Sequence, residues 1–310
     1  MLTRVKISGT SSHIFMSVRI VSFLPSTTEI VCELGLSEQL FGVTIECNWP
    51  EGVRDGREIV VGTFTDPSMS PGEIDAIVRQ RVAEGLDLYT LDDEALGRCA
   101  PDLILSQDLC RVCAVASGDV EAAVARLNCS ADVLQIDPQT LDEVIHSVET
   151  IADAAGVTSR GREYTAALRT RLDTIAQRVA GQPRPNVFVL EWVDPPFCAG
   201  HWVPDIVEQA GGNAVLARPG ERSVGVTWQE IADAEPEFVI VAPCGYNLDQ
   251  AEAQAHSVLS DLPPSTQVWA IDADAVMVRP GPRLIEGVEA LAAVLHGVAT
   301  PPAHLVRQIR

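Results

Sequence analysis

Short apolar runs alternate with amphipathic stretches along the first half of the chain. The runs have the length and composition of buried strands, and they lie at 19–24, 41–45, 59–61, 103–105 and 132–136. Between them, apolar residues recur at helical spacing near 27–34 and over 69–87, 91–99 and 119–127. Strands that alternate with helices are typical of βαβ units, so the pattern predicts a mainly parallel sheet.

Three of the expected helices have recognisable start signals. Ser26 or Thr27 can cap the first helix. Ser70 is followed by proline at the first helical position and by glutamate at the third, and Thr227 has a glutamate three residues later. These signals predict where the helices begin.

A long helical pattern runs over 141–180, with a break near Gly156, and separates two similar halves of the chain. The second half again alternates strands, at 186–192, 238–242 and 267–271, with helices, the last of which stops at Gly297. We therefore expect an α/β fold of two Rossmann-like lobes with mainly parallel sheets, joined by a single long connecting helix. The expected division is a disordered or mis-annotated N-terminus at 1–17, lobes at 18–150 and 185–300, a helical connector at 151–184 and a tail at 301–310.

Charge and composition exclude several classes of function. A net charge of −21 argues against binding to nucleic acid or to an anionic membrane surface. The sequence contains no run of eighteen apolar residues, so it predicts no transmembrane helix. Residues 1–17 lack the apolar segment of a signal peptide, and Met16 is a plausible true start. We therefore expect a cytoplasmic protein; an exported one is the alternative if a leader is missing or miscalled.

Eight cysteines in a chain without an export signal are typical of reduced thiols. Cys110 and Cys113 form a C-x-x-C directly after a strand, and other cysteines follow strand ends at 47, 198 and 244. Ligands of open α/β sheets bind at the carboxyl ends of strands. The pattern therefore predicts a thiol-lined site for Zn or Fe, or a redox pair, although each thiol could equally be packed in the core. The candidate metal ligands are Cys47, Cys110, Cys113, Cys198, His201 and Cys244.

Several segments together resemble the vitamin B12 and iron-siderophore solute-binding proteins of ABC importers, and most closely the cobalamin-binding branch. The resemblance covers nearly all of residues 18–298. It is carried by the segments Arg19-Ile-Val-Ser-Phe-Leu-Pro-Ser-Thr-Thr-Glu-Ile, Leu34-Gly-Leu, Gly42-Val-Thr, Asp194-Pro-Pro-Phe-Cys-Ala-Gly, Val207-Glu-Gln-Ala-Gly-Gly-Asn and Pro280-Gly-Pro-Arg283.

This resemblance implies a two-lobed binding protein that encloses a cobalamin-like corrinoid, or another metal chelate, between its lobes. A corrin ring needs aromatic walls and few polar contacts. The candidate ligand-binding residues are Trp49, Trp192, Pro196, Phe197, Trp202, Tyr246 and Arg279. The alternatives are ordinary core packing for the tryptophans and a surface salt bridge for the arginine.

The chain departs from the family pattern in three respects. It shows no export signal, residues 69–89 look like an insertion, and the cysteines at strand ends are not part of the importer pattern. Family members dock onto a permease through one exposed carboxylate per lobe. Glu94 matches the first position, but Gln229 occupies the second, with Glu230 adjacent. This departure argues against a permease partner.

The predicted function is therefore non-catalytic binding of a corrinoid or another metal chelate. The alternative is a cytoplasmic thiol-dependent protein that binds metal or performs redox chemistry through the cysteines at the strand ends. Glu29, Glu46 and Asp108 show no spacing typical of a paired carboxylate site, and no nucleophile elbow or H-E-x-x-H motif appears.

Overall fold

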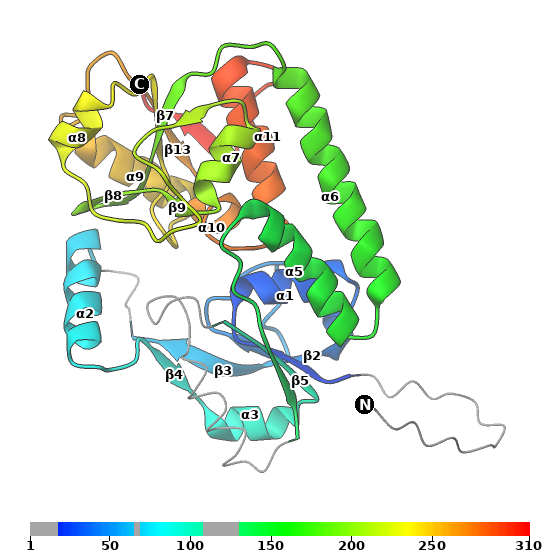
Figure 1. The fold of residues 1–310 in the computed structure, drawn as a ribbon. Helices are drawn as coiled ribbons and strands as arrows, with labels where there is room; N and C mark the ends of the chain where they lie inside the picture. The colour runs from blue at the N-terminus through cyan, green and yellow to red at the C-terminus, as the bar shows by residue number, and fades with distance from the viewer. Residues whose placement is uncertain (1–17, 65–68, 108–129) are drawn as a thin grey trace, which may run out of the picture.

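The computed structural model describes residues 18–64, 69–107 and 130–310. Over these residues the chain forms two α/β lobes, each built on its own sheet (Figure 1). The predicted fold class is confirmed, whereas the domain boundaries stay predictions. The helix expected over 119–127 lies outside the described residues.

The sheet of the first lobe has six strands in the order β4-β3-β2-β1-β5-β6. Five strands are parallel to their neighbours, and β4 runs antiparallel to β3. Their bounds are β1 Ile20–Ser22, β2 Leu40–Thr44, β3 Glu58–Thr63, β4 Tyr89–Leu91, β5 Leu103–Ser106 and β6 Asp132–Gln135. β4 was not expected, because the apolar pattern over 69–99 predicts only helices.

Alternate residues of β1 face opposite sides of this sheet, as the period of a strand requires. Ile20 packs in one core with α1 (Pro25–Glu33) and α5 (Leu141–Ala154), and Val21 packs in another with α3 (Asp93–Cys99). The prediction that Ser26 or Thr27 caps the first helix is wrong. The helix begins at Pro25, so both residues lie inside its first turn, where they are buried.

The second lobe is built on a sheet of order β10-β7-β12-β13-β14, with β8 paired to β7. Its strands are β7 Asn186–Val193, β8 Pro196–Cys198, β10 Asn213–Ala214, β12 Phe238–Val241, β13 Gln267–Ile271 and β14 Val306–Gln308, and β9 Gly200–His201 pairs separately with β11 Arg218–Pro219. Within the segment expected as a tail at 301–310, β14 pairs antiparallel with β13.

Helices cover both faces of the second sheet. One core contains residues of α7 (Val203–Gln209) and α11 (Leu284–His296), and the other contains residues of α8 (Trp228–Asp233) and α9 (Leu248–Val258). A short helix, α10 (Ala273–Val276), follows β13. The predicted capping boxes at Ser70 and Thr227 are both present.

The predicted long connecting helix is α6 (Thr158–Val179), which packs against α5. α6 follows α5 after the predicted break, and its 22 residues span about 33 Å. α5 contacts both α1 and α7, and α6 runs beside both lobes (Figure 1). The connection is therefore a packed helical pair.

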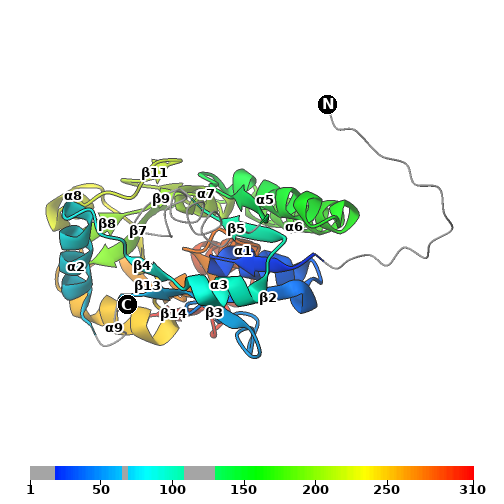
Figure 2. The same ribbon diagram turned by 90° about the horizontal axis from the view of Figure 1, so that it is seen from below.

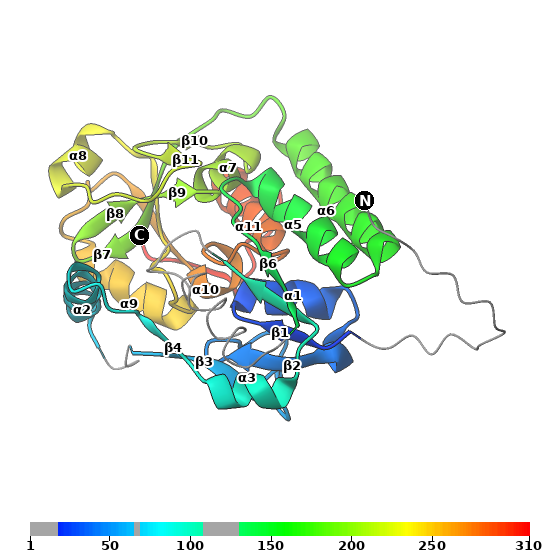
Figure 3. The ribbon, with the colours of Figure 1, turned by 60° about the horizontal axis from the view of Figure 1, so that its bottom comes forward.

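On the opposite side of the molecule, α2 (Pro71–Ala83) rises from the first lobe towards the second (Figures 2 and 3). None of its residues is buried. A Cβ added to Gly72 would lie 2.7 Å from Asp194 Oδ2 of the second lobe. The first turn of α2 therefore touches the loop that follows β7.

None of the described helices combines the length and the apolar composition that are needed to cross a membrane.

We predict that Gly161→Ala destabilises the protein, although alanine is the better helix former by about 1 kcal/mol. A Cβ at position 161 of α6 would lie 2.4 Å from Ala152 Cβ of α5. Overpacking of this kind costs about 1–3 kcal/mol in the free energy of unfolding, measured by denaturant titration. The double variant Ala152→Gly/Gly161→Ala should lose less than the sum of the two single effects, and a stabilised Gly161→Ala would contradict the prediction.

Candidate functional site

Several strands end where the two lobes meet. In the first lobe β2 leads into residues 45–49, and in the second lobe β7, β12 and β13 lead into residues 194, 242–247 and 272–274. The carboxyl ends of strands in open α/β sheets commonly form ligand sites. Side chains from these segments form the interlobe site described below.

Arg279, in the loop between α10 and α11, joins the lobes. Its Nη1 donates to Asn48 Oδ1 at 2.6 Å and lies 3.3 Å from Glu29 Oε1, and its Nη2 donates to the backbone oxygen of Glu46 at 3.2 Å. On its own lobe Arg279 pairs with Asp274 at 2.7 Å. Asn48 Nδ2 also donates to Asp274 Oδ2 at 2.9 Å. We call these five residues the Arg279 network.

Glu29 is the most buried acid of this network, with 1% of its surface exposed. Desolvation raises the pKa of its carboxyl to about 7, against the opposing effects of Arg279 and Arg283. Its second oxygen, Oε2, has no hydrogen-bond partner among the described residues and faces Gly281. The Arg279 network therefore offsets the desolvation of the Glu29 carboxyl only in part.

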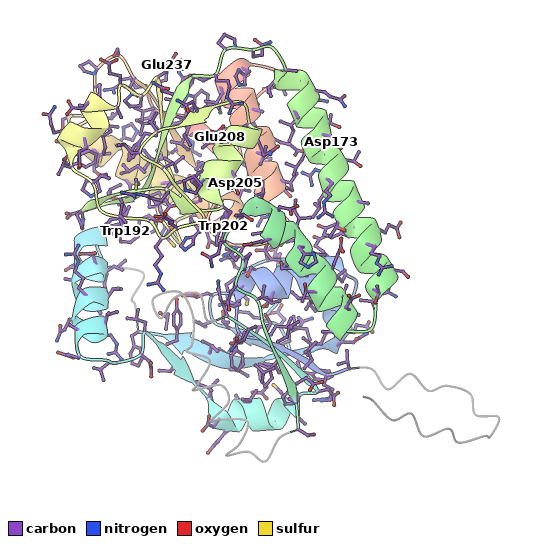
Figure 4. The ribbon with its side chains drawn as sticks, in the orientation of Figure 1. Asp173, Trp192, Trp202, Asp205, Glu208 and Glu237 are labelled. Atoms are coloured by element: carbon purple, nitrogen blue, oxygen red, sulfur yellow. The ribbon has the colours of Figure 1, made fainter. Side chains whose placement is uncertain are left out.

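Aromatic side chains flank the network on both lobes. Trp49 is 41% exposed in the first lobe, and the Arg283 guanidinium lies 4.3 Å from the centre of its ring. In the second lobe Trp192 contacts Tyr246 edge to face at 5.7 Å, and the Tyr246 backbone accepts a hydrogen bond from Asp274. Figure 4 shows Trp192 at the edge of the second lobe that faces the first. The predicted residues Trp49, Trp192 and Tyr246 are thus brought to one region.

Carboxyls and a thiol lie on the same segments that follow the strand ends, next to these aromatics in the sequence. Glu191, next to Trp192, accepts hydrogen bonds from Ser223 Oγ and from the backbone of Gly200, and desolvation raises its pKa to about 7. Desolvation also raises the pKa of Glu46, against the opposing effect of Arg279. Cys244 is exposed, and its backbone donates to Glu191 O at 3.1 Å. The pKa of its thiol is raised by desolvation and by nearby carboxyls, so it stays neutral near pH 7.

Four other predicted ligand-binding residues have structural roles in the described chain. Trp202 is 5% exposed, belongs to the core that contains residues of α7 and α11, and donates its indole N–H to Met277 O at 2.8 Å. Pro196 is buried, and the half-buried Phe197 forms a β-bridge to the 225 segment. Arg279 is not a free cation for a ligand anion, because its guanidinium is already bonded within the network.

The cysteines do not form the predicted cluster. Cys47 is buried and hydrogen-bonded with Thr28 Oγ1 at 3.2 Å and Thr44 Oγ1 at 3.5 Å, and Cys198 is buried in the second-lobe core. Only Cys244 of the described cysteines predicted as metal ligands is exposed. Within the ranges that the structure describes, no three His, Cys, Asp or Glu residues group as a metal site. Cys110 and Cys113 lie outside those ranges.

His201 has a positive φ of 50° and lies 5.5 Å from the Trp202 ring. Its Nε2 is buried without a partner among the described residues, and desolvation, with Arg222 nearby, lowers its pKa. It is therefore a neutral imidazole in the rim of the second lobe and joins no cysteine.

Sequence reasoning missed Asn48, Glu191 and Asp274. Glu191 had a detectable signal, because it is an acid at the end of an otherwise apolar strand. Asn48 and Asp274 had none, because their role depends on how the lobes pack.

The two positions compared with permease-docking residues are both on the surface. Glu94 is exposed in the first turn of α3. Gln229 is exposed on α8 and donates to Asp233 at 2.7 Å, and Glu230 is occupied by its capping bonds to Thr227.

Comparison with known proteins gives a consistent result. A family model described as periplasmic binding protein matches residues 20–267. An uncharacterized ABC transporter substrate-binding lipoprotein from Bacillus subtilis is 24% identical over 283 residues, which are 88% of this chain and 78% of that protein. A vitamin B12-binding protein from Vibrio cholerae is 22% identical over 289 residues, which are 91% and 90% of the two chains.

Solved structures share the fold. A periplasmic heme-binding protein from Pseudomonas aeruginosa matches with a TM-score of 0.69 and 20% identity, over 94% of this chain and 98% of that chain. The periplasmic vitamin B12-binding protein of Vibrio cholerae matches with a TM-score of 0.65 and 20% identity, over 91% and 98%.

These comparisons overturn the expectation of a cytoplasmic protein. The matched family is one of periplasmic binding proteins, and the Bacillus subtilis relative is a lipoprotein. The relatives therefore indicate an exported protein.

We predict that Arg279→Met lowers the free energy of unfolding by about 3 kcal/mol or more, because it removes the cation that is bonded to the buried Glu29 carboxyl. Arg171→Met is the matched control, since Arg171 pairs with Glu289 at the surface and such pairs contribute about 0–1 kcal/mol. Adding Glu29→Gln to Arg279→Met should recover part of the loss. Equal effects of the two arginine substitutions in denaturant titration would contradict a structural role for the network.

We also predict a pH dependence of stability from Glu29 and Glu191. Their pKa values rise from 4.5 to about 7 on folding, so between these values the folded protein binds more protons than the unfolded chain. Their contribution to the free energy of unfolding therefore falls as pH rises through this range. Denaturant titration at several pH values gives the free energy of unfolding of wild type and of Glu29→Gln/Glu191→Gln. Between the two pKa values this free energy should fall more steeply with pH in the wild type than in the variant, and parallel curves would refute the prediction.

Proposed function

The chain belongs to the periplasmic binding protein family, and on that premise we propose that it binds a corrinoid, or another metal chelate of similar size, at the interlobe site. The family consists of substrate-binding proteins of ABC importers, not of enzymes. Its members bind small-molecule ligands and work with a permease.

The observation that carries the proposal is the aromatic surface beside the Arg279 network. Ile45, Trp49 and Phe64 are each more than 40% exposed; Ile45 and Phe64 directly follow β2 and β3, and Trp49 lies in the loop after β2. Exposed apolar side chains that gather at one place mark a binding surface. On the second lobe, the Trp192–Tyr246 pair adds a second aromatic surface.

The chemistry of this surface suits a large, mostly apolar ring system. Ligand sites are lined mainly by apolar and aromatic groups, with a few polar groups that orient the ligand. Since the described residues offer no group of ligands for a bare ion, a metal would arrive inside its own chelate. The vitamin B12-binding relative supports a corrinoid, and the heme-binding structural neighbour supports the broader class of metal chelates.

Delivery to a permease belongs to the same proposal. Glu94 is exposed on α3 and offers a carboxylate for docking of the first lobe. The second lobe offers Gln229 at the matching position, so its contribution to docking would differ from the pattern of the family.

We predict that the protein binds cyanocobalamin, measured by equilibrium dialysis and by quenching of tryptophan fluorescence. Trp49→Ala should weaken binding at least about tenfold, because truncation of a buried aromatic contact in a binding site commonly costs 2 kcal/mol or more. Trp228→Ala is the control, since Trp228 lies on α8 away from the interlobe site.

The ligand proposal fails if neither cyanocobalamin, hemin nor a ferric siderophore binds the folded protein. The role of the aromatic surface fails if a ligand binds and Trp49→Ala and Trp228→Ala bind it equally well.

A further inference from the structure

We propose that Arg283 is a further ligand-binding residue, and that it receives a carboxylate on the edge of the bound chelate. This inference rests on the proposed function and deepens it, because it names the chemical class of the ligand as a metal chelate with an acidic side group. It is carried by the contrast between Arg283 and Arg279, which both lie where the lobes meet.

The guanidinium of Arg283 lies between the lobes without an acceptor. Its Cζ is 4.3 Å from the centre of the Trp49 ring of the first lobe, and Arg283 itself directly precedes α11 of the second. Its Nε is buried and has no hydrogen-bond partner in the ranges that the structure describes. The Glu286 carboxylate is 4.0 Å from this Nε, which is beyond hydrogen-bonding distance.

Arg279 shows how a structural arginine is bonded at the same place. Its two Nη atoms donate to Asn48, to the backbone oxygen of Glu46 and to Asp274, at 2.6, 3.2 and 2.8 Å. The side chain of Arg283 is placed almost as deeply, with 15% exposed against 10% for Arg279. A cation that is withdrawn from water without acceptors is unfavourable. Packing alone therefore gives no reason for an arginine at position 283.

The helix that begins here adds to this cost. Arg283 is the N-cap of α11, which has 13 residues, and its side chain makes no capping bond. The N-terminal end of a helix carries a partial positive charge, which is unfavourable for a cation and favourable for an anion. An acidic group beside Arg283 would be stabilised by the guanidinium and by the helix together.

The acids around Arg283 are bonded to other groups. Desolvation raises the pKa values of Glu29 and Asp272, and Arg283 is among the groups that oppose this rise. Glu29 is paired with Arg279, however, and Asp272 accepts a backbone N–H in the first turn of α10. The Glu286 side chain is 38% exposed, so water screens its attraction. The charge of Arg283 is thus not neutralised by a direct bond from these acids.

The stack on Trp49 suits a flat ligand with an acidic edge. The indole covers one face of the guanidinium, so its remaining donors are the N–H groups in its own plane. A carboxylate is flat and accepts two such bonds in that plane. Because Trp49 is 41% exposed, a ring system that packs on the indole brings its edge groups to the same guanidinium.

The test compares ligands that differ only in one side group. Each of the three monocarboxylate isomers of cyanocobalamin has a carboxylate in place of one side-chain amide, at a different position on the ring edge. At least one isomer should bind about tenfold more tightly than cyanocobalamin, because the bond between the two charged groups is made in a largely desolvated place. Calorimetric titration at about 0.15 M salt screens the distant acids of the protein.

Hemin and its dimethyl ester are the equivalent pair if the protein binds porphyrins and not corrinoids. Hemin carries two carboxylates that the ester lacks, so hemin should be the tighter ligand.

Variants of Arg283 identify the residue responsible. Arg283→Gln should abolish the preference for the carboxylate. Arg283→Lys should keep part of it, because lysine retains the charge but not the planar pair of donors. Arg178→Gln is the matched control, since Arg178 is exposed near the end of α6 and its replacement also removes one positive charge. The preference should stay as in the wild type in this control.

A measurement without ligand separates recognition from a structural role. Since Nε of Arg283 has no acceptor within the described chain, Arg283→Gln should unfold at the same denaturant concentration as the wild type, or at a higher one. A loss of stability as large as that of Arg279→Met would instead assign Arg283 to the support of the fold.

The outcomes distinguish this inference from the function on which it rests. If the wild type prefers no carboxylate isomer and does not prefer hemin to its ester, or if it binds only a ferric siderophore that lacks carboxylates, the inference is wrong while the binding function stands. A preference that persists in Arg283→Gln would overturn the role of Arg283. If no corrinoid, porphyrin or ferric siderophore binds, the proposed function itself is wrong.

Discussion

The guanidinium of Arg279 joins the two lobes at one buried point, and the geometry of the interlobe site depends on it. It connects Glu29 in the middle of α1 and Glu46 in the loop after β2 of the first lobe with Asp274 in the second. A buried charge that loses its partners costs several kcal/mol, so only a narrow range of lobe positions keeps the network intact. The exposed Trp49 and the Trp192–Tyr246 pair are presented beside this point from opposite lobes.

The same network explains the charge of the site. Arg279 is bonded to Glu29 and Asp274 and, against desolvation, also lowers the pKa of Glu46, whereas Glu191 is held by the neutral donors Ser223 and Gly200. An arginine that holds lobes together is unavailable to a ligand, whatever its sequence position suggests. The guanidinium of Arg279 therefore has a structural role and not a role in ligand recognition.

The sequence predicted most of the fold, because strands, capping boxes and helix stops are encoded locally. It missed β4 and β14, whose assignment depends on strands distant in the chain. It predicted ligand contact for both Trp49 and Trp202, yet Trp49 is exposed and Trp202 is core, where its indole bonds to Met277, a residue distant in the chain. Thiols at strand ends looked equivalent in sequence, but only the fold distinguishes Cys47, which is bonded inside the first lobe, from the exposed Cys244.

A polar contact between lobes has a physical consequence that an apolar contact would not have. If the lobes separate, water can hydrate the groups of the Arg279 network, including the Glu29 oxygen that has no partner when they are together. The gain from that hydration opposes closure, because a buried unsatisfied acceptor is costly. Contacts between a ligand and the aromatic surfaces of both lobes would have to offset it. Glu29 therefore makes closure of the lobes depend on what lies between them, while α5 and α6 hold the two halves in register on the other side.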